Sequence, residues 1–120
     1  MAKNDQVVCS VEDHFRGRDP SVRVTYDRIL EAARRFGAVG EEPKKTSIHL
    51  TNRTAFAGVA TRRSSIVLTL KLPVDLKSPR VSRHERASAN RWHLEIRLLD
   101  SREVDREVRG WLREAYGLAR

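Results

Sequence analysis

The chain has little cysteine, no long apolar run and few aromatic residues, and these scarcities remove whole classes of protein. Cys9 is the only cysteine among 120 residues, so neither an internal disulfide nor a cysteine-based zinc site is available. The longest unbroken apolar run covers only a few residues, too few for a membrane-spanning helix. The first ten residues, MAKNDQVVCS, are polar and lack the apolar region of a signal peptide. We therefore expect a cytoplasmic protein that does not enter a membrane.

Catalytic motifs are also scarce. The four histidines, at positions 14, 49, 84 and 93, include no close-spaced pair of the HxH or HExxH kind, so we expect no metal site and no cofactor. A nucleophile elbow, a phosphate-binding loop and a dinucleotide fingerprint are all missing. Asp75 and Lys77 form an Asp-x-Lys sequence, but metal-dependent cleavage needs a second carboxylate, for which only Glu41 and Glu42 are candidates. The sequence favours a protein that is not an enzyme.

Positive charge is what the chain has in excess. Its formal net charge is +8, and arginine outnumbers lysine 19 to 5. Cationic side chains bind polyanions through counterion release, so nucleic acid is the leading candidate partner. The arginines extend from Arg16 to Arg120 with no single block, and a GC-rich coding sequence alone could produce the same bias. No recognised groove-reading motif is present, so such binding would be weak, independent of base sequence and strongly salt-dependent.

Apolar and polar residues alternate in several short runs between residues 46 and 98. In the runs 66–72 and 92–98 every even-numbered residue is apolar, and most residues between them are polar. A period of two predicts strands with one buried side and one side facing water. We expect strands at Thr46–Thr51, Ala55–Ala60, Ser64–Val74 and Arg91–Leu99, and the short links favour antiparallel neighbours. Gly58 predicts a bulge or a close backbone approach within the second strand.

Helical periodicity occurs on both sides of the strand region. Ser10 and Asp13 suit the start of a short helical turn, a longer helix should run from Ser21 to about Arg35, and a third helix should run from about Ser101 to Tyr116. Residues 40–43 are expected to be a loop and residues 76–90 to be irregular. The fold class is α+β: a single domain in which two main helices pack on one face of an antiparallel sheet of four or more strands. Residues 1–20 form an N-terminal segment with the short turn, and residues 21–120 form the compact domain.

The same periodicities predict the core. On the strands the buried set is Ile48, Leu50, Phe56, Ile66, Leu68, Leu70, Trp92, Leu94 and Ile96. The apolar stripes of the two main helices are Val24, Ile29, Leu30, Ala33 and Phe36 on the first, and Val104, Val108, Trp111, Leu112 and Ala115 on the second. Tyr26 and Tyr116 are the aromatic residues expected to reach solvent.

Several separated phrases of the sequence carry a family resemblance. They are His14-Phe15, PKKTSIHL at 43–50, NRTAFAGV at 52–59, SPR at 78–80, NRWH at 90–93 and WLREAY at 111–116. In order and spacing they resemble an uncharacterised bacterial family, domain of unknown function 5655. The resemblance covers nearly the whole chain. It implies a small free-standing α+β domain, found alone or fused to other bacterial modules, with no established activity.

The outward side of the predicted sheet supplies the candidate binding residues. The strand register should place His49, Thr69, Lys71, His93 and Arg97 on one face, with Lys45 and Arg53 near the ends of the first link and Arg80 as a further anion-holding residue. If the first and fourth predicted strands lay near the middle of the sheet, His49 and His93 could come within hydrogen-bonding range. Two histidines among cations can hold an anion or pass a proton near neutral pH. A solvated sheet face is also ordinarily polar without any such role.

Three functions remain open on the sequence alone. The favoured one is a non-enzymatic module that binds an anionic partner, nucleic acid first, through the basic side of the sheet. The second is a small-ligand or catalytic site built around His49 and His93, which a concave pocket joining those side chains would favour. The third is a protein–protein assembly module, such as a homodimer formed through an exposed strand edge or helix face. Clustering of arginine over the sheet would favour the first, and an even spread would weaken it.

Overall fold

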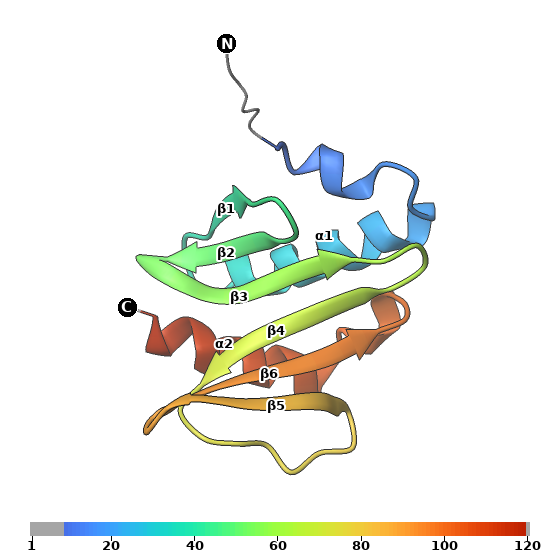
Figure 1. The fold of residues 1–120 in the computed structure, drawn as a ribbon. Helices are drawn as coiled ribbons and strands as arrows, with labels where there is room; N and C mark the ends of the chain where they lie inside the picture. The colour runs from blue at the N-terminus through green and yellow to red at the C-terminus, as the bar shows by residue number, and fades with distance from the viewer. Residues whose placement is uncertain (1–8, 120) are drawn as a thin grey trace.

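An antiparallel sheet with two helices on one of its faces makes up the structure, a computed structural model that describes residues 9–119 (Figure 1). Residues 1–8 of the predicted N-terminal segment, and residue 120, lie outside this range. The sheet has six strands in the order β1-β2-β3-β4-β6-β5, and each neighbouring pair is antiparallel. The elements are η2 (Glu12–Phe15), α1 (Pro20–Arg34), β1 (Gly40–Pro43), β2 (Ile48–Asn52), β3 (Thr54–Thr61), β4 (Ile66–Leu72), β5 (Val81–Ser88), β6 (Arg91–Leu98), η3 (Ser101–Glu103) and α2 (Arg106–Leu118). The α+β prediction is confirmed, with two strands more than the four expected.

The predicted alternation sets the register of the central strands. The even-numbered residues of β4 are fully buried and pair with the even-numbered residues of β6, for example Leu68 with Ile96 and Leu70 with Leu94. His93 and Arg97 lie on the opposite side, as predicted. Of the nine strand residues expected in the core, eight are buried and Trp92 is half-buried. A slip of one residue would expose this whole set, so burial fixes the register.

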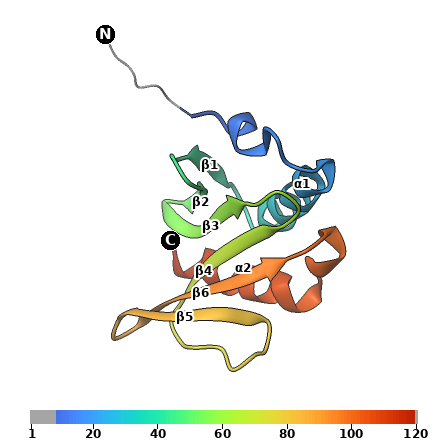
Figure 2. The ribbon, with the colours of Figure 1, turned by 45° about the vertical axis from the view of Figure 1, so that its right-hand side comes forward.

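Both helices cover the same face of the sheet (Figures 1 and 2). The stripe of α2 predicted from the sequence is correct, because Val108, Leu112 and Ala115 are buried and Trp111 packs half-buried beside them. The stripe of α1 is partly wrong: Val24 is 55% exposed, and Tyr26, expected near solvent, is fully buried. Its hydroxyl donates to Glu41 on β1, which allows the ring to enter the core without an unpaired polar group. Neither helix among residues 9–119 combines the length and apolar content of a membrane-crossing helix.

The helix boundaries differ from the prediction by a few residues. Helix α1 begins at Pro20 after Asp19, and Ser21 lies inside the helix. Proline suits this first position because its ring presets the helical φ angle and its missing N–H has no helical partner there. The C-terminal helix divides in two: Asp100 caps η3, and α2 begins only after Asp105, whose carboxylate accepts from the Val108 amide at 3.1 Å.

Two edge strands were not predicted. Residues 40–43, expected to be a loop, form β1, and part of the segment expected to be irregular forms β5. Only Val81 of β5 is buried, and the remaining seven residues are exposed. An edge strand with so little buried surface leaves no apolar alternation to detect. Charged side chains on β5 are typical of edges that avoid pairing with another chain.

The bulge expected at Gly58 lies two residues earlier. Leu50 pairs with Ala57 and Thr51 pairs with Ala55, so Phe56 is an extra residue of β3 between these pairs. Phe56 and Ala57 are both buried, which breaks the alternation that β3 otherwise follows. A Cβ at Gly58 would meet its nearest neighbour at 3.9 Å, an ordinary contact, so no close approach requires glycine there.

The described part of the N-terminal segment lies against the domain. Ser10 and Asp13 bond each other's backbone amides, the capping arrangement predicted from their spacing. The Thr61 hydroxyl donates to the His14 carbonyl, and the Phe15 and Tyr26 rings lie 5.2 Å apart. These contacts attach η2 to the end of β3 and to α1.

Candidate functional site

The bulge in β3 opens a cleft beside β4. Strand β3 pairs with β4 only from Ala57 to Thr61, and β4 continues past Leu70 with β6 as its sole partner. The two strands therefore separate at this end of the sheet, where the C-terminal end of α2 lies behind them (Figure 1). The resulting cleft has a volume of about 240 Å³.

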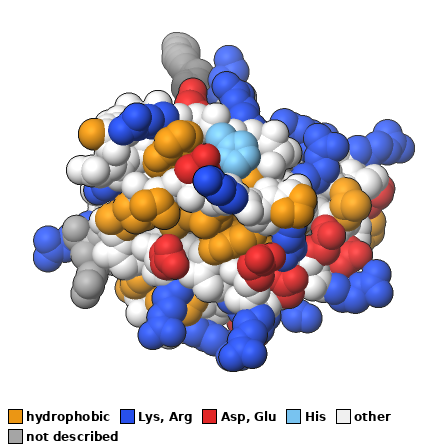
Figure 3. Space-filling view, turned by 90° about the horizontal axis from the view of Figure 1, so that it is seen from below, with side chains coloured by type: hydrophobic (Ala, Val, Ile, Leu, Met, Phe, Trp, Pro, Cys, Tyr) orange, Lys and Arg blue, Asp and Glu red, His pale blue; other side chains and the backbone are white. Residues whose placement is uncertain are grey.

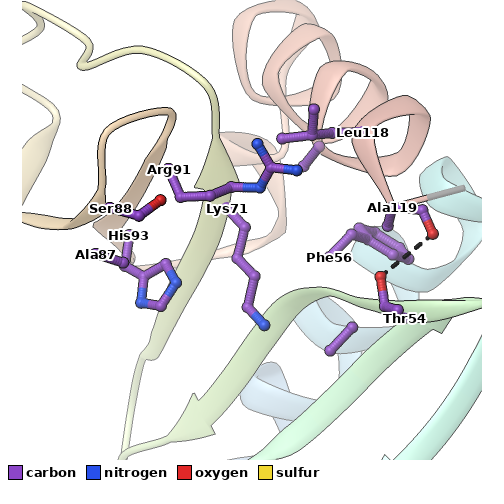
Figure 4. A pocket seen from close by; sticks show the side chains of 11 residues that line it. Thr54, Phe56, Lys71, Ala87, Ser88, Arg91, His93, Leu118 and Ala119 are labelled. Carbon is purple, nitrogen blue, oxygen red and sulfur yellow. Dashed lines mark hydrogen bonds between the residues drawn. The ribbon is translucent and has the colours of Figure 1, made fainter.

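An apolar wall and a basic wall line the cleft. The apolar wall consists of Phe56 of β3 and Ala115, Leu118 and Ala119 at the end of α2. The basic wall comes from β4 and β6. In Figure 4, Lys71 extends toward β3, Arg91 extends toward Leu118, and His93 lies beside them. Thr54 fixes the apolar wall, because its amide and its hydroxyl both donate to the Ala119 carbonyl.

A second hollow of about 290 Å³ adjoins the cleft on the open face, the side of the sheet away from α1 and α2. Its floor is made of small residues of β3 and β4, including Gly58 and Thr69, and His49 of β2 lines it. Lys71 and His93 line both concavities. The small side chains of β3 are the reason for the hollow, since larger residues at these positions would fill it.

The two histidines have different surroundings. Partial burial lowers the pKa of His49 below its usual 6.5, and the nearby cations Lys44 and Lys71 lower it further against the opposing effect of Glu42. His49 is therefore neutral near pH 7 and offers one ring N–H and one acceptor nitrogen. His93 lies with its Nδ1 3.6 Å from a carboxylate oxygen of Glu85 on the edge strand.

Unpaired cations are the main electrostatic feature of the cleft. Among the residues that the structure describes, no Asp or Glu lines the cleft or the hollow. Among residues 9–119, neither Lys71 nor Arg91 lies within 4 Å of an acidic oxygen; the Arg91 guanidinium donates only to the adjacent Asn90 carbonyl. Both side chains belong to partly buried residues. The site can accept an anion without first breaking an ion pair.

The structure brings together three of the predicted site residues and separates four. His49, Lys71 and His93 line the hollow. Lys45 and Arg53 are exposed in the β1–β2 and β2–β3 turns, and Arg97 is exposed farther along β6; none of the three lines either concavity. The condition under which His49 and His93 could come within hydrogen-bonding range is not met, because β2 and β6 each lie second from an edge of the sheet. Strands β3 and β4 lie between β2 and β6, which puts the two backbones about 14 Å apart.

Arg80 has a structural role in place of the predicted anion-holding one. Its guanidinium contacts both carboxylate oxygens of Asp105 at 3.0 and 2.9 Å, Glu107 at 3.1 Å, and the Glu103 carbonyl at 2.9 Å. The side chain also lies over the Trp111 ring. These partners hold the loop before β5 against the start of α2, and they leave no charge for an external anion.

Arg91 is the cleft residue that the sequence analysis missed. It begins β6 and shares the odd-numbered face with His93, so the alternation already placed it on the polar side. Its position opposite Leu118 depends on where α2 ends, which no local pattern reveals. Within residues 9–119, no group of three or more His, Cys, Asp or Glu side chains converges as a metal site would require.

Arginine side chains are spread over the molecule and do not gather on the sheet. Figure 3, the view from below Figure 1, shows one side of the molecule, on which Lys and Arg side chains lie at the rim and also nearer the centre, interspersed with acidic and apolar side chains. On the open face, Arg83 lies near Glu85 and Glu95, and Lys44 lies 3.6 Å from Glu42. By the criterion set out above, this spread weakens the idea that the sheet binds a polyanion along its length.

The architecture and the cleft together define a small α+β domain with a concave basic site at one end of its sheet. The chain belongs to the family described as Domain of unknown function (DUF5655), whose model matches residues 11–119. The match confirms the resemblance read from the sequence phrases. No curated protein and no solved structure matches the chain.

Proposed function

We propose that this domain is a binding module for an anionic ligand held in the cleft between β3 and β4. The observation that supports it best is the pair of partly buried cations, Lys71 and Arg91, for which residues 9–119 supply no carboxylate in the cleft walls. An anion placed between them gains charge-assisted hydrogen bonds. The guanidinium of Arg91 can hold a carboxylate or phosphate with two parallel bonds, and Lys71 adds a point charge.

The apolar wall indicates what the rest of the ligand is. Phe56, Leu118 and the alanines of α2 offer no partner for a polar group, so the body of the ligand opposite the anion should be apolar. The cleft alone is smaller than the roughly 300–1,000 Å³ of typical ligand pockets. A small aromatic or aliphatic carboxylate or phosphate fits these requirements, and the adjoining hollow leaves room for a polar extension toward His49.

Titration with small model anions tests this function. Phenyl phosphate, benzoate and inorganic phosphate are added to the ¹⁵N-labelled protein, and amide shifts are followed by NMR. We expect phenyl phosphate to bind more tightly than inorganic phosphate and to shift signals of β4, β6 and the end of α2. Lys71→Gln with Arg91→Gln should abolish those shifts.

The matched control removes two exposed cations outside the cleft, Lys77→Gln with Arg97→Gln, and should bind like the parent chain. An equal loss of anion binding in both double variants would mean that the net charge of the protein, and not the cleft, attracts the anion. Shifts confined to other parts of the molecule would contradict the proposed site.

Catalysis at this site is the weaker alternative. The ring nitrogens of three histidines contact a carbonyl or carboxylate oxygen: Lys44 O for His14, Asp75 for His84 and Glu85 for His93. None of these contacts pairs a histidine with a hydroxyl or thiol nucleophile, and His49 and His93 are too far apart to share a proton directly. The geometry therefore supports binding over turnover.

Assembly through a sheet edge is the third candidate. The charged side chains of β5 oppose edge-to-edge pairing, and β1 is only four residues long and ends at Pro43. A homodimer would have to use another surface. Light scattering that gives a stable dimer at micromolar concentration would support this candidate.

A further inference from the structure

A basic groove lies between α1 and α2, on the side of the molecule away from the open face. Arg28 and Arg35 come from α1 and its C-cap, and Arg109 and Arg113 come from α2. One end of the groove is a hollow of about 260 Å³ lined by Arg28, Arg35 and Arg109. The other end is a wider hollow of about 750 Å³ lined by Arg35 and Arg113, so Arg35 joins the two.

Helical spacing produces this arrangement. Residues seven apart project from the same face of a helix about 10 Å apart along its axis, as Arg28 and Arg35 do. Arg109 and Arg113 are four apart and lie on one face of α2. Because the helices pack side by side on the sheet, the two arginine pairs border the same groove.

The four guanidiniums of the groove have no acidic partners in the described range. Among residues 9–119, none lies within 4 Å of a carboxylate oxygen, and the one recorded bond is from Arg109 to the Val104 carbonyl at 3.0 Å. Other arginines of α1 are paired: Arg23 contacts Asp27 at 3.0 Å and Arg34 contacts Glu41 at 3.5 Å. Within the part of the chain that the structure describes, Glu31 is the only acidic residue in the lining of either hollow.

An aromatic ring lies in the wider hollow beside the arginines. Phe36, predicted as core, is only half-buried and lines this hollow together with Arg35 and Arg113. Its ring packs against Tyr116 at 5.9 Å, and the Tyr116 hydroxyl is already bonded to the Ala38 carbonyl. A partly exposed ring next to unpaired arginines is the combination that binds an unpaired base and its phosphates.

We propose that the α1–α2 groove binds single-stranded nucleic acid, with phosphates on the four arginines and a base against Phe36. The arrangement fits this partner better than an acidic protein, because guanidiniums bind phosphate in a bidentate manner and the groove places an aromatic ring beside them. The contacts reach phosphates and a base face, so binding should be independent of base sequence. This site is separate from the cleft and does not rest on the function proposed for it.

Fluorescence anisotropy with labelled twelve-residue oligo-dT and oligo-U tests the groove. With four phosphate contacts, log Kobs should fall against log salt with a slope near −3, from about −0.7 per phosphate on a single strand. The quadruple variant R28Q/R35Q/R109Q/R113Q should weaken binding at least about tenfold at low salt and flatten this slope. The matching lysine variant at the same four positions should retain most of the slope.

The control removes four other exposed arginines, R62Q/R63Q/R83Q/R86Q, and so has the same net charge as the groove variant. We expect it to bind within about threefold of the parent chain, because screened charges far from the strand contribute little. Phe36→Leu separates stacking from charge: affinity should fall about fivefold or more with the salt slope unchanged. Thermal melting checks that each variant folds.

Several results would overturn the proposal. They are no oligonucleotide binding at 20 mM salt, equal losses in the groove and control variants, tighter binding of a duplex than of a single strand, or equally tight binding of poly-glutamate. Lys71→Gln with Arg91→Gln should leave oligonucleotide binding unchanged. That outcome would show that oligonucleotide binding does not use the cleft, so the two proposed sites can be confirmed or rejected independently.

Discussion

The open face of the sheet and the α1–α2 surface carry positive charge in different ways. On the open face Arg83 lies near Glu95 and Lys44 lies near Glu42, whereas Arg97 and the cleft residues Lys71 and Arg91 have no carboxylate within 4 Å among residues 9–119. Between the helices, four arginines share a groove with a single glutamate. A nearby carboxylate offsets the positive potential that would attract an anionic partner. The positions of arginines without a nearby carboxylate therefore say more about anion binding than the number of arginines does.

The largest expected effect is a loss of stability on substitution of Phe56, which lines the apolar wall of the cleft. Phe56→Ala should lower the free energy of unfolding by about 3–5 kcal/mol, because the ring is fully buried and contacts Tyr116 at 5.3 Å. Urea denaturation followed by far-UV circular dichroism measures it. Phe56→Leu should cost much less, because it keeps most of the volume. A loss below 1 kcal/mol for the alanine variant would show that the bulge does not place Phe56 in the core.

The next effect distinguishes a structural arginine from an exposed one. Arg80→Ala should lower stability by about 1–2 kcal/mol, since it removes charge-assisted bonds to Asp105 that are only partly screened. Arg83→Ala should cost no more than about 0.5 kcal/mol, because its carboxylate contacts are near 4 Å and solvent-exposed. Equal losses in the two variants would contradict the roles assigned to them.

The stabilising effect of Arg80 should also depend on pH. Burial opposes the shift, but the Val108 amide and Arg80 together lower the pKa of Asp105 below its usual 3.8. A carboxyl whose pKa is depressed by folding stabilises the native state above the unfolded value and loses that effect as pH falls through the folded value. The difference between the parent chain and Asp105→Asn should therefore be fully present at pH 6 and shrink below about pH 4. A difference that stays constant down to pH 2.5 would contradict this assignment.

The sequence predicted the central strands well because each repeats a pattern of burial. In β4 and β6 every second residue is buried except the half-buried Trp92, so the alternation predicts both register and orientation. Strands β1 and β5 were missed because an edge strand buries too little to leave a pattern. The prediction that Tyr26 reaches solvent was wrong because its hydroxyl donates to Glu41, fifteen residues later, and a hydroxyl with such a partner can be buried.

The candidate sites were harder to predict than the fold. The odd-numbered faces of β4 and β6 correctly placed Lys71 and His93 on the polar side. The cleft itself depends on the bulge at Phe56 and on where α2 ends. The structural role of Arg80 depends on its contact with Asp105, which is distant in the sequence. The i, i+7 spacing of Arg28 and Arg35 is visible in the sequence, but the proximity of these two arginines to α2 follows only from the packing of the helices. Local sequence patterns predict which face of each strand or helix is polar, and long-range contacts decide which of these faces lie next to each other.

A smaller effect concerns the outer surface of α2. Gly110→Ala should raise the free energy of unfolding by about 0.5–1 kcal/mol, because glycine is a poor helix former and a Cβ there meets no atom within 4 Å. Thermal melting shows the gain as a higher Tm. The variant keeps every groove arginine, so a destabilised protein would mean that the surroundings of α2 differ from those described.

The smallest effect tests the electrostatics of the hollow. A bound anion favours protonated His49, whose pKa is depressed in the free protein, so phenyl phosphate should bind about threefold more tightly at pH 6 than at pH 8. Without ligand, the depressed pKa makes the fold less stable as pH falls below 6.5, because the unfolded histidine binds the proton more readily. His49→Gln should remove both dependences, and calorimetric titration at the two pH values measures the first. An unchanged ratio in His49→Gln would assign the effect to another group.

The comparison between the two surfaces is tested most directly by mapping two titrants on one ¹⁵N-labelled sample. Phenyl phosphate should shift amides of Lys71, Arg91 and His93, and oligo-dT should shift amides of α1 and α2 around Arg35 and Arg113. Each titrant should leave the other region unchanged, and saturating one should not weaken the other. Shifts of the same residues by both titrants, or shifts spread evenly over the surface, would contradict the account of two separate anion sites.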